Sequence, residues 1–354
     1  MNCQMPIALF HALALIALAG CAAPVRKPSV VGSGAATSEP IASAPAGVLD
    51  QRAPGCNVVR GWPSLPEGEI LGQATGVGVD SRGAVIVFHR AGRTWIEPFP
   101  KDSIAAPTVW VFDGVTGRLL RTWGAGVFIM PHGLSVDSED NVWLTDVGRQ
   151  QVFKFTSDGR LLLTLGERAV AGADSTHFNR PTDVAVRPDG GFYVSDGYEN
   201  TRVMRFDARG RFLRQWGSRG SGPGQLDLPH GIALDSMGRV YVADRSNARV
   251  QVFDSTGRFV ADWHGPLLGR PYGVAVGPDG SVFTVDGGDQ PERPPDRAAA
   301  THLKADGAVI QRFGRFGNYD GQFWRAHDVA VAADGAVYVV DVLGQRVQKF
   351  LCRP

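Results

Sequence analysis

Residues 131–166 read PHGLSVDSEDNVWLTDVGRQQVFKFTSDGRLLLTLG, and this stretch decides the fold. It contains four short apolar segments separated by turns that contain Asp, Asn, Ser or Gly. β-Branched and aromatic side chains are typical of strands, and Gly, Asp, Asn and Ser are typical of tight turns. The stretch therefore predicts four consecutive strands joined by short turns.

The same pattern recurs along the chain. Full copies start at Arg180 (RPTDVAVRPDGGFYVSDGYENTRVMRFDARGRFLRQWG) and at Leu228 (LPHGIALDSMGRVYVADRSNARVQVFDSTGRFVADWHG), and weaker copies begin near Thr75, Arg270 and Arg325. A four-stranded repeat of about 40 to 50 residues is typical of a propeller blade, and these copies resemble NHL-type repeats. Six copies predict an all-β fold, a six-bladed β-propeller that occupies 56–354 as one domain.

Composition narrows the classes of function. The 354 residues carry a formal net charge of +1 and include 45 glycines, as a turn-rich β protein requires. A nearly neutral chain without a clustered basic face gives no electrostatic case for a nucleic-acid partner. We expect a small-molecule or peptide substrate instead, and a monomer.

The first 55 residues do not follow the repeat. The apolar stretch from Ile7 to Gly20 is too short for an ordinary membrane-spanning helix and is typical of a signal peptide over 1–20. Its last residues and the next read LAGC, which resembles a bacterial lipobox, so we expect a lipid on Cys21; simple cleavage is the alternative. Residues 21–55 are rich in Ala, Pro, Ser and Gly and predict a flexible tether. We therefore expect the protein in the bacterial cell envelope, lipid-anchored and facing the periplasm, or secreted.

The cysteines fit an exported protein. Cys3 is removed with the signal peptide and Cys21 carries the lipid, which leaves Cys56 and Cys352 at opposite ends of the propeller sequence. A propeller usually closes by pairing its terminal segments in one blade, so these two residues are expected to be neighbours. We predict a disulfide between them, and two unpaired thiols are the alternative.

Three histidines recur at one place in the repeat, at sequence intervals of 98 and 97 residues. The first strand of each blade lines the central channel, and we call the residue near the start of that strand the rim position. Its six residues are Thr75, His132, Thr182, His230, Tyr272 and His327. Histidine occupies blades two, four and six, so three imidazoles should converge on the channel axis. Three neutral imidazoles with an open fourth position are how catalytic zinc is held, whereas any one such histidine alone is more often structural.

Three further residues should surround the histidines. The loop from strand four into strand one and the loop from strand two to strand three emerge on the same face of a propeller. The residues just after the second strands include Arg90, Tyr198 and Arg245. Nearby positive charge favours a phenolate, so Tyr198 is a candidate general base. The two arginines suit carboxylate recognition, and surface ion pairs are their alternative role.

The chain resembles a known family from about residue 75 to residue 351. The family is peptidyl-α-hydroxyglycine α-amidating lyase, the lyase domain of peptidylglycine α-amidating enzymes. The resemblance lies in the segments VFHRAGRTW, MPHGLSVDSEDNVWLTDV, HFNRPTDVAV, FYVSDGYEN, LPHGIALD, VADRSNARVQVF and AHDVAVAADGAVYVVD. It implies that His132, His230 and His327 bind zinc, that Tyr198 is the base, and that Arg90 and Arg245 are the two active-site arginines.

The resemblance also implies a calcium site within the channel. Its ligands would be the side chain of Asp328 and the backbone carbonyls of Val77 and Leu134. The animal enzymes carry disulfide cysteines where this chain has Asn179, Glu199, Tyr241 and Val252. We therefore expect packing alone to make the region around Tyr198 rigid.

The implied reaction is cleavage of the C–N bond of a carbinolamide, which yields an amide and glyoxylate. Two other classes remain open. One is a gluconolactonase-like hydrolase, although those enzymes bind calcium through carboxylate and Asn ligands. The other is a non-catalytic NHL scaffold that binds a protein or an envelope polymer. The Pro-rich insertion from Asp289 to Arg297 is expected on the active face, either shaping access or as a plain solvent loop.

Overall fold

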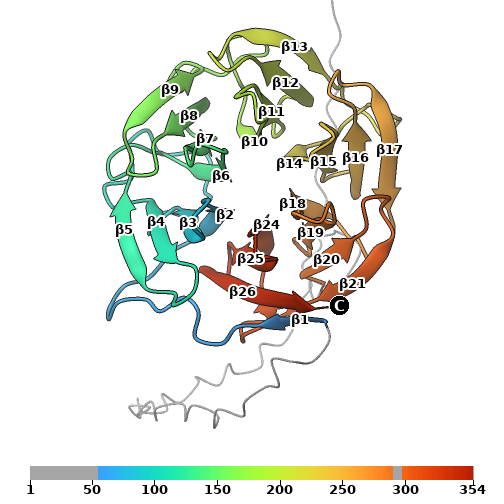
Figure 1. Cartoon of the computed structure of the whole chain (residues 1–354). Helices are drawn as coiled ribbons and strands as arrows, with labels where there is room; N and C mark the ends of the chain where they lie inside the picture. The colour runs from blue at the N-terminus through green and yellow to red at the C-terminus, as the bar shows by residue number, and fades with distance from the viewer. Residues whose placement is uncertain (1–54, 290–296, 354) are drawn as a thin grey trace, which may run out of the picture. The chain divides into compact units, whose positions relative to one another are not determined.

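Six four-stranded antiparallel sheets surround a central channel in the computed structural model (Figure 1). The structure describes residues 55–289 and 297–353, and these contain no helix. The predicted all-β, six-bladed propeller is therefore confirmed. The predicted signal peptide, Cys21, nearly all of the tether, and residues 290–296 of the Pro-rich insertion lie outside the described residues. Within the described ranges, no helix has the length and apolarity to cross a bilayer.

Blades 1 to 3 each take four consecutive strands. Blade 1 consists of β2 (Ala74–Val79), β3 (Ala84–His89), β4 (Val109–Asp113) and β5 (Leu119–Trp123). Blade 2 consists of β6 (Pro131–Val136), β7 (Val142–Asp146), β8 (Gln151–Phe155) and β9 (Leu161–Leu165). Blade 3 consists of β10 (Pro181–Val186), β11 (Phe192–Asp196), β12 (Arg202–Phe206) and β13 (Phe212–Trp216).

Blades 4 and 5 follow the same plan, and blade 6 differs. Blade 4 consists of β14 (Pro229–Leu234), β15 (Val240–Asp244), β16 (Arg249–Phe253) and β17 (Phe259–His264). Blade 5 consists of β18 (Pro271–Val276), β19 (Val282–Asp286), β20 (Ala299–Leu303) and β21 (Val309–Phe313). Blade 6 consists of β24 (Ala326–Val331), β25 (Ala336–Asp341), β26 (Arg346–Arg353) and the N-terminal strand β1 (Gly55–Val58). A short parallel pair, β22 (Arg315–Phe316) and β23 (Gln322–Phe323), lies between blades 5 and 6 in the sequence.

Blade 6 closes the ring by joining the two ends of the described chain. β1 pairs antiparallel with β26, beside which it lies in Figure 1, and Cys56 is directly opposite Cys352. The structure joins these two residues in a disulfide. β1 begins at Gly55, so the strand starts one residue before the predicted propeller boundary.

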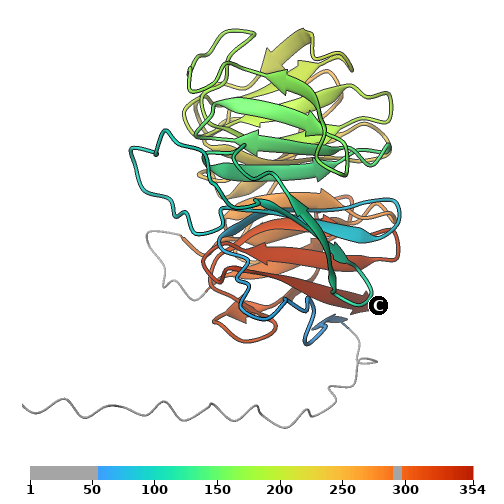
Figure 2. The same cartoon turned by 90° about the vertical axis from the view of Figure 1, so that its left-hand side faces the viewer.

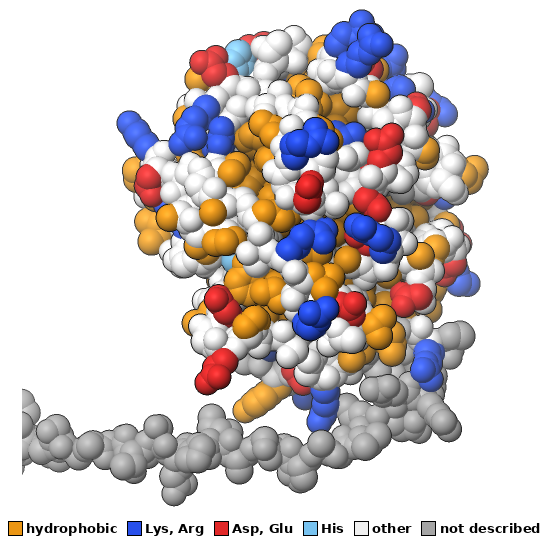
Figure 3. Space-filling model, turned by 60° about the vertical axis from the view of Figure 1, so that its left-hand side comes forward, with side chains coloured by type: hydrophobic (Ala, Val, Ile, Leu, Met, Phe, Trp, Pro, Cys, Tyr) orange, Lys and Arg blue, Asp and Glu red, His pale blue; other side chains and the backbone are white. Residues whose placement is uncertain are grey.

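The blades stack face to face, so their middle strands are covered on both sides. The turned view in Figure 2 shows the sheets as successive layers. Trp143 of β7 packs on Phe192 of β11 in the next blade, with ring centroids 4.4 Å apart. This burial explains why the middle strands are continuous apolar runs, whereas the outer strand β9 exposes Leu161 and Leu162. On the face drawn in Figure 3, basic and acidic side chains of the described residues are interspersed.

Two local features fix the end of the blades at which the channel strands begin, the first in all six blades and the second in five. The strand register shifts directly after the first residue of each inner strand, at the rim position, and such bulges re-aim side chains. In addition, the second strand ends in a buried Asp in five blades. Asp146, for example, accepts hydrogen bonds from the backbone N–H groups of Ile129, Met130 and Gly148. This bonding fixes the loop that enters the channel strand.

Candidate metal centre and active site

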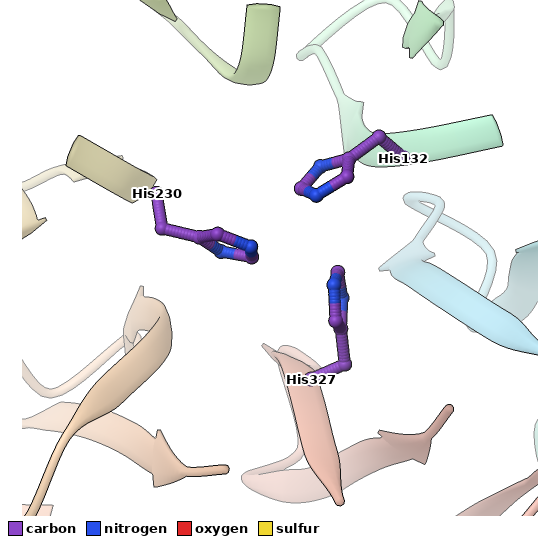
Figure 4. A group of neighbouring side chains, drawn as sticks. All are labelled: His132, His230 and His327. Carbon is purple, nitrogen blue, oxygen red and sulfur yellow. The ribbon is translucent and has the colours of Figure 1, made fainter. Parts of the chain in front are cut away.

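Three imidazoles converge on the channel axis. His132, His230 and His327 are the second residues of β6, β14 and β24, and Figure 4 shows their rings pointing toward one another. One ring nitrogen of each lies within 4.8 Å of the others, and all three side chains are buried. The structure therefore brings together the three histidines that the repeat placed in alternate blades.

Each imidazole is held by the rim position of the next blade. The Nδ1 atoms lie within hydrogen-bond distance of backbone carbonyls: 2.7 Å from His132 to Thr182, 2.8 Å from His230 to Tyr272, and 2.7 Å from His327 to Thr75. A carbonyl only accepts, so Nδ1 carries the proton and the Nε2 lone pair remains available. Metal-binding histidines are commonly oriented in this way. The non-histidine rim residues thus contribute their backbone to the site.

Burial keeps the imidazoles uncharged. Burial, together with the positive charge of Arg90, lowers the pKa of His132 to about 3. Burial and the neighbouring imidazoles hold the pKa values of His230 and His327 well below the usual value. All three are neutral at physiological pH, as metal ligands must be. Three neutral nitrogen donors from separate strands fit a catalytic zinc site.

The Tyr198 hydroxyl lies against the three imidazoles of His132, His230 and His327, which we call the imidazole layer. It is 3.1 Å from Nε2 of His132 and 3.4 Å from Nε2 of His230. The Tyr198 ring packs against Trp95, with centroids 5.0 Å apart, and Trp95 in turn packs edge-on against Phe99. Both aromatic residues belong to the connection from β3 to β4. Packing therefore positions Tyr198.

Arg90 forms one wall of the site and is held on three sides. Its Nε donates to the backbone carbonyl of Pro131 at 3.1 Å, and Nη1 donates to Oε1 of Gln73 at 3.0 Å. Its guanidinium lies over the Trp95 ring, 5.1 Å from the centroid. Burial lowers the pKa of Arg90 to about 10, so the group remains charged at neutral pH. Its orientation is fixed before any ligand binds.

Arg245 forms another wall, and Tyr272 and Asp289 hold it. Nη2 of Arg245 donates to Oδ2 of Asp289 at 2.7 Å and also to the hydroxyl of Tyr272, over whose ring the guanidinium lies at 3.9 Å. The Tyr272 hydroxyl also donates to Asp289. Burial opposes the charge of Arg245, but Tyr198, Tyr272 and Asp289 together raise its pKa above the ordinary value. Its buried Nε has no hydrogen-bond partner among the described residues.

These groups share one cavity of about 410 Å³. Its lining consists of Gln73, Arg90, Thr94, Trp95, Glu97, Tyr198, Arg245, Tyr272, Arg325, His327, Val342 and Leu343. The cavity thus contains Arg90, Tyr198, Arg245 and His327 from the predicted site. Sequence reasoning did not assign Trp95, Tyr272 or Arg325 to the site. For Tyr272 a signal existed, because it occupies a rim position.

A second layer, the carboxylate layer, is formed by Asp183 and Asp328, each one residue after the rim position of its channel strand. Asp328 accepts the Val77 N–H at 3.0 Å, and Asp183 accepts the Ile232 N–H at 3.0 Å. These two carboxylates, Val77 and Leu134 line a hollow of about 230 Å³. Since Val77 directs its N–H away from β3, its carbonyl is on the same free edge of β2. This arrangement fits the oxygen donors that calcium takes.

Asp183 is the residue of this layer that sequence reasoning missed. Burial raises its pKa to about 7. Burial and the charge of Asp183 also raise the pKa of Asp328 well above its usual value. A signal was present, since the residue after the rim position is Asp in blades 3 and 6 and Gly in the other four. Two buried carboxylates that repel each other are suited to a cation.

The sequence is similar to NHL repeats and to members of the α-amidating lyase family. NHL repeat models match residues 128–155, 178–206 and 226–253. The chain is 35% identical over 326 residues to peptidyl-alpha-hydroxyglycine alpha-amidating lyase 2 of Drosophila melanogaster, covering 86% of this chain and 74% of that protein. It is 35% identical over 318 residues to peptidyl-glycine alpha-amidating monooxygenase B of Xenopus laevis, covering 82% of this chain and only 35% of that longer protein.

Solved structures of lower sequence identity also resemble this chain, and their similarity is less specific. A gluconolactonase from Xanthomonas campestris superposes with a TM-score of 0.55 at 14% identity, covering 84% of this chain and 95% of that one. Similarity at this level shows a shared propeller fold alone.

Proposed function

Because this chain belongs to the peptidyl-α-hydroxyglycine α-amidating lyase family, we propose that it cleaves a carbinolamide, R–CO–NH–CH(OH)–COO⁻, to the amide R–CO–NH₂ and glyoxylate. The C–N bond breaks, the hydroxyl proton is transferred overall to the amide nitrogen, and no electrons are exchanged with a cofactor. The observation that carries the proposal is the Tyr198 hydroxyl, which contacts two of three converging neutral imidazoles.

We propose zinc as the metal of the imidazole layer. His132, His230 and His327 would hold it through Nε2, because their Nδ1 atoms are engaged with backbone carbonyls. When bound, zinc supplies a Lewis acid that polarises the oxygen of the substrate hydroxyl. The burial of all three ligands limits competition from water.

Tyr198 would act as the general base. A substrate hydroxyl held at the imidazole layer would be within proton-transfer distance of the Tyr198 oxygen, which lies 3.1 Å from Nε2 of His132. The same phenol can then return the proton to the departing amide nitrogen. Trp95 keeps the ring in place during both transfers. Arg90 and Arg245 would hold the substrate carboxylate and orient the C–N bond, since guanidinium and carboxylate groups pair through two parallel hydrogen bonds.

We propose calcium for the carboxylate layer, with a structural role. Asp328 and the backbone carbonyls of Val77 and Leu134 would bind it, and Asp183 adds a second carboxylate that the resemblance did not supply. The cation would offset the repulsion between the two buried acids. Export and lipid attachment at Cys21 remain predictions.

Incubation of purified, zinc-loaded protein with α-hydroxyhippurate tests the function. The expected result is release of glyoxylate and benzamide in equal amounts, loss of this release after zinc removal by dipicolinate, and recovery on zinc addition. A zinc-loaded protein that releases no glyoxylate contradicts the proposal and favours a non-catalytic scaffold. Hydrolysis of gluconolactone with calcium alone would favour the lactonase class instead.

A further inference from the structure

Arg325 has an unusual position in the cavity. It lies two residues before His327, and its backbone is fixed, because its N–H donates to Oδ1 of Asp341 at 2.7 Å and its carbonyl accepts the Val342 N–H at 3.0 Å. Its side chain lines the cavity. No residue in 55–289 or 297–353 hydrogen-bonds to the Arg325 guanidinium or forms an ion pair with it.

The other charged groups of the cavity wall have protein partners. Arg245 pairs with Asp289, and Glu97 accepts two hydrogen bonds from Arg180, at 3.0 and 2.9 Å. Arg90 donates to neutral acceptors and keeps its charge, which suits the substrate carboxylate. Arg325 therefore adds a positive charge that the proposed reaction does not use. Arg325 is half-buried, and a partly buried cation with no anionic partner among the described residues is typical of an anion-binding position.

Arg325 would lie beside the acyl part of a substrate bound for the proposed reaction. If the reacting carbon is at the imidazoles and its carboxylate is on Arg90 and Arg245, the rest of the substrate can extend toward the blade 6 wall of the same cavity. That wall consists of Arg325, Val342 and Leu343. A cavity of about 410 Å³ has room for an acyl group of several carbons.

We propose that Arg325 recognises a carboxylate on the acyl side of the substrate, so that the preferred carbinolamide carries two negative charges. The assignment of the reacting half rests on the proposed lyase function. The binding of the second anion does not depend on turnover. Val342 and Leu343 would contact the methylene groups that join the two charged ends.

Binding of unreactive analogues tests this inference directly. N-glutarylglycine and N-valerylglycine have acyl chains of equal length, and only the first ends in a carboxylate. We expect the zinc-loaded protein to bind N-glutarylglycine about tenfold or more tightly, as a charge-assisted hydrogen bond allows. Arg325→Gln should abolish this preference while changing the Kd for N-valerylglycine by less than about twofold. Isothermal titration calorimetry at fixed ionic strength measures both.

Arg315→Gln is the matched control. Arg315 is exposed and lies in the same connection between blades 5 and 6, outside the cavity lining. It removes the same charge and should leave the preference intact. Loss of the preference in both variants would show a long-range field effect and would overturn the inference. Equal weakening of both analogues by Arg325→Gln would also overturn it, because Arg325 would then bind the shared carboxylate.

Turnover separates this inference from the proposed function. The α-hydroxyglycine forms of the two analogues both release glyoxylate if the chain is the proposed lyase, and kcat/KM should favour the glutaryl compound. Absence of glyoxylate from both, with the binding preference retained, would overturn the lyase assignment and leave the Arg325 site standing. Glyoxylate release together with equal binding of the two analogues would support the lyase function and overturn the Arg325 site.

Discussion

The channel carries two layers of side chains that differ in symmetry and chemistry although they are one residue apart in the sequence. The imidazole layer takes nitrogen donors from blades 2, 4 and 6. The carboxylate layer takes Asp183 and Asp328 from the opposed blades 3 and 6. Neutral nitrogen donors suit zinc, and charged oxygen donors suit calcium. One repeated backbone can thus present two different donor sets.

The backbone explains why blade 2 contributes to the imidazole layer alone. At Gly133, directly after the rim position, an added Cβ would lie 2.3 Å from the Thr182 carbonyl oxygen. That carbonyl is the one that His132 Nδ1 contacts. A side chain directly after His132 would therefore compete with it for space in blade 2, whereas blade 6 accommodates both His327 and Asp328. Glycine follows the rim position in four blades, and only blades 3 and 6 have a side chain there.

The largest expected effect comes from removing one member of the imidazole layer. His230→Ala should reduce glyoxylate release by about 10³-fold or more, because a Lewis acid supplies several kcal/mol of transition-state stabilisation. Elemental analysis should show zinc lost and calcium retained. His264→Ala is the matched control, since His264 is exposed in the same blade. If His230→Ala kept both its zinc and its activity, the imidazole layer would not be the metal site, and the contrast between the two layers would fail.

The next effect separates the two tyrosines that face the imidazoles. Tyr198→Phe should lower kcat by about 10² to 10³-fold with zinc content unchanged, as expected for loss of a general base. Tyr272→Phe should change kcat by less than about tenfold, because its hydroxyl donates to Asp289 instead of contacting a histidine Nε2. Stopped-flow turnover and metal analysis of both variants check this. A reversed ranking would transfer the role of base to Tyr272.

A smaller effect concerns stability in the carboxylate layer. The pKa of Asp183, raised from 3.8 to about 7, means that the unfolded chain ionises first as the pH rises. The free energy of unfolding of the calcium-free protein should therefore fall between about pH 4 and pH 7 and stay low above it, by about 4 kcal/mol from this group. Asp183→Asn removes this loss but leaves one backbone N–H unpaired, so we expect a net gain of about 2 kcal/mol at pH 8.

Thermal unfolding at pH 5 and pH 8, in EGTA and in calcium, measures that gain. Calcium should stabilise the wild-type protein at pH 8 more than it stabilises Asp183→Asn. Zinc content and kcat should be unchanged in the variant, because the imidazole layer does not depend on Asp183. An equal pH dependence in the two proteins would show that burial does not raise the pKa of Asp183 in this way.

Sequence predicted the repeat and the imidazole layer because both are periodic, and it predicted the closure because the terminal segments of a propeller usually pair in one blade. His132, His230 and His327 occupy one strand position, and that position lies on the channel in any propeller. The Arg325 cation and the Tyr272–Asp289 pair were not predictable in this way. Arg325 shares its repeat position with Arg180 and Arg270, and Tyr272 is at a rim position, but the contacts of their side chains, including the Asp289 partner, depend on irregular connections over the channel. Asp183 is intermediate, since its position is periodic but only two blades use it.

The smallest effect concerns how the two ends of the channel are covered. The imidazole end is covered by the long β3–β4 connection, which Glu97 ties to Arg180 of blade 3. Glu97→Gln should cost at most about 1 kcal/mol, typical of an exposed ion pair, and should lower kcat/KM by about two- to fivefold by loosening Trp95 against Tyr198.

Asp189→Asn is the matched control for this pair. It breaks a similar bidentate contact with Arg187, in the β10–β11 turn at the other end of blade 3. It should leave kcat/KM unchanged, because nothing at that end contacts Tyr198. Both variants should lose little stability, so a difference in kcat/KM between them isolates the effect of the β3–β4 connection. Equal kcat/KM in the two variants would mean that Trp95 holds Tyr198 without help from Glu97, and that the two ends of the channel differ in chemistry alone.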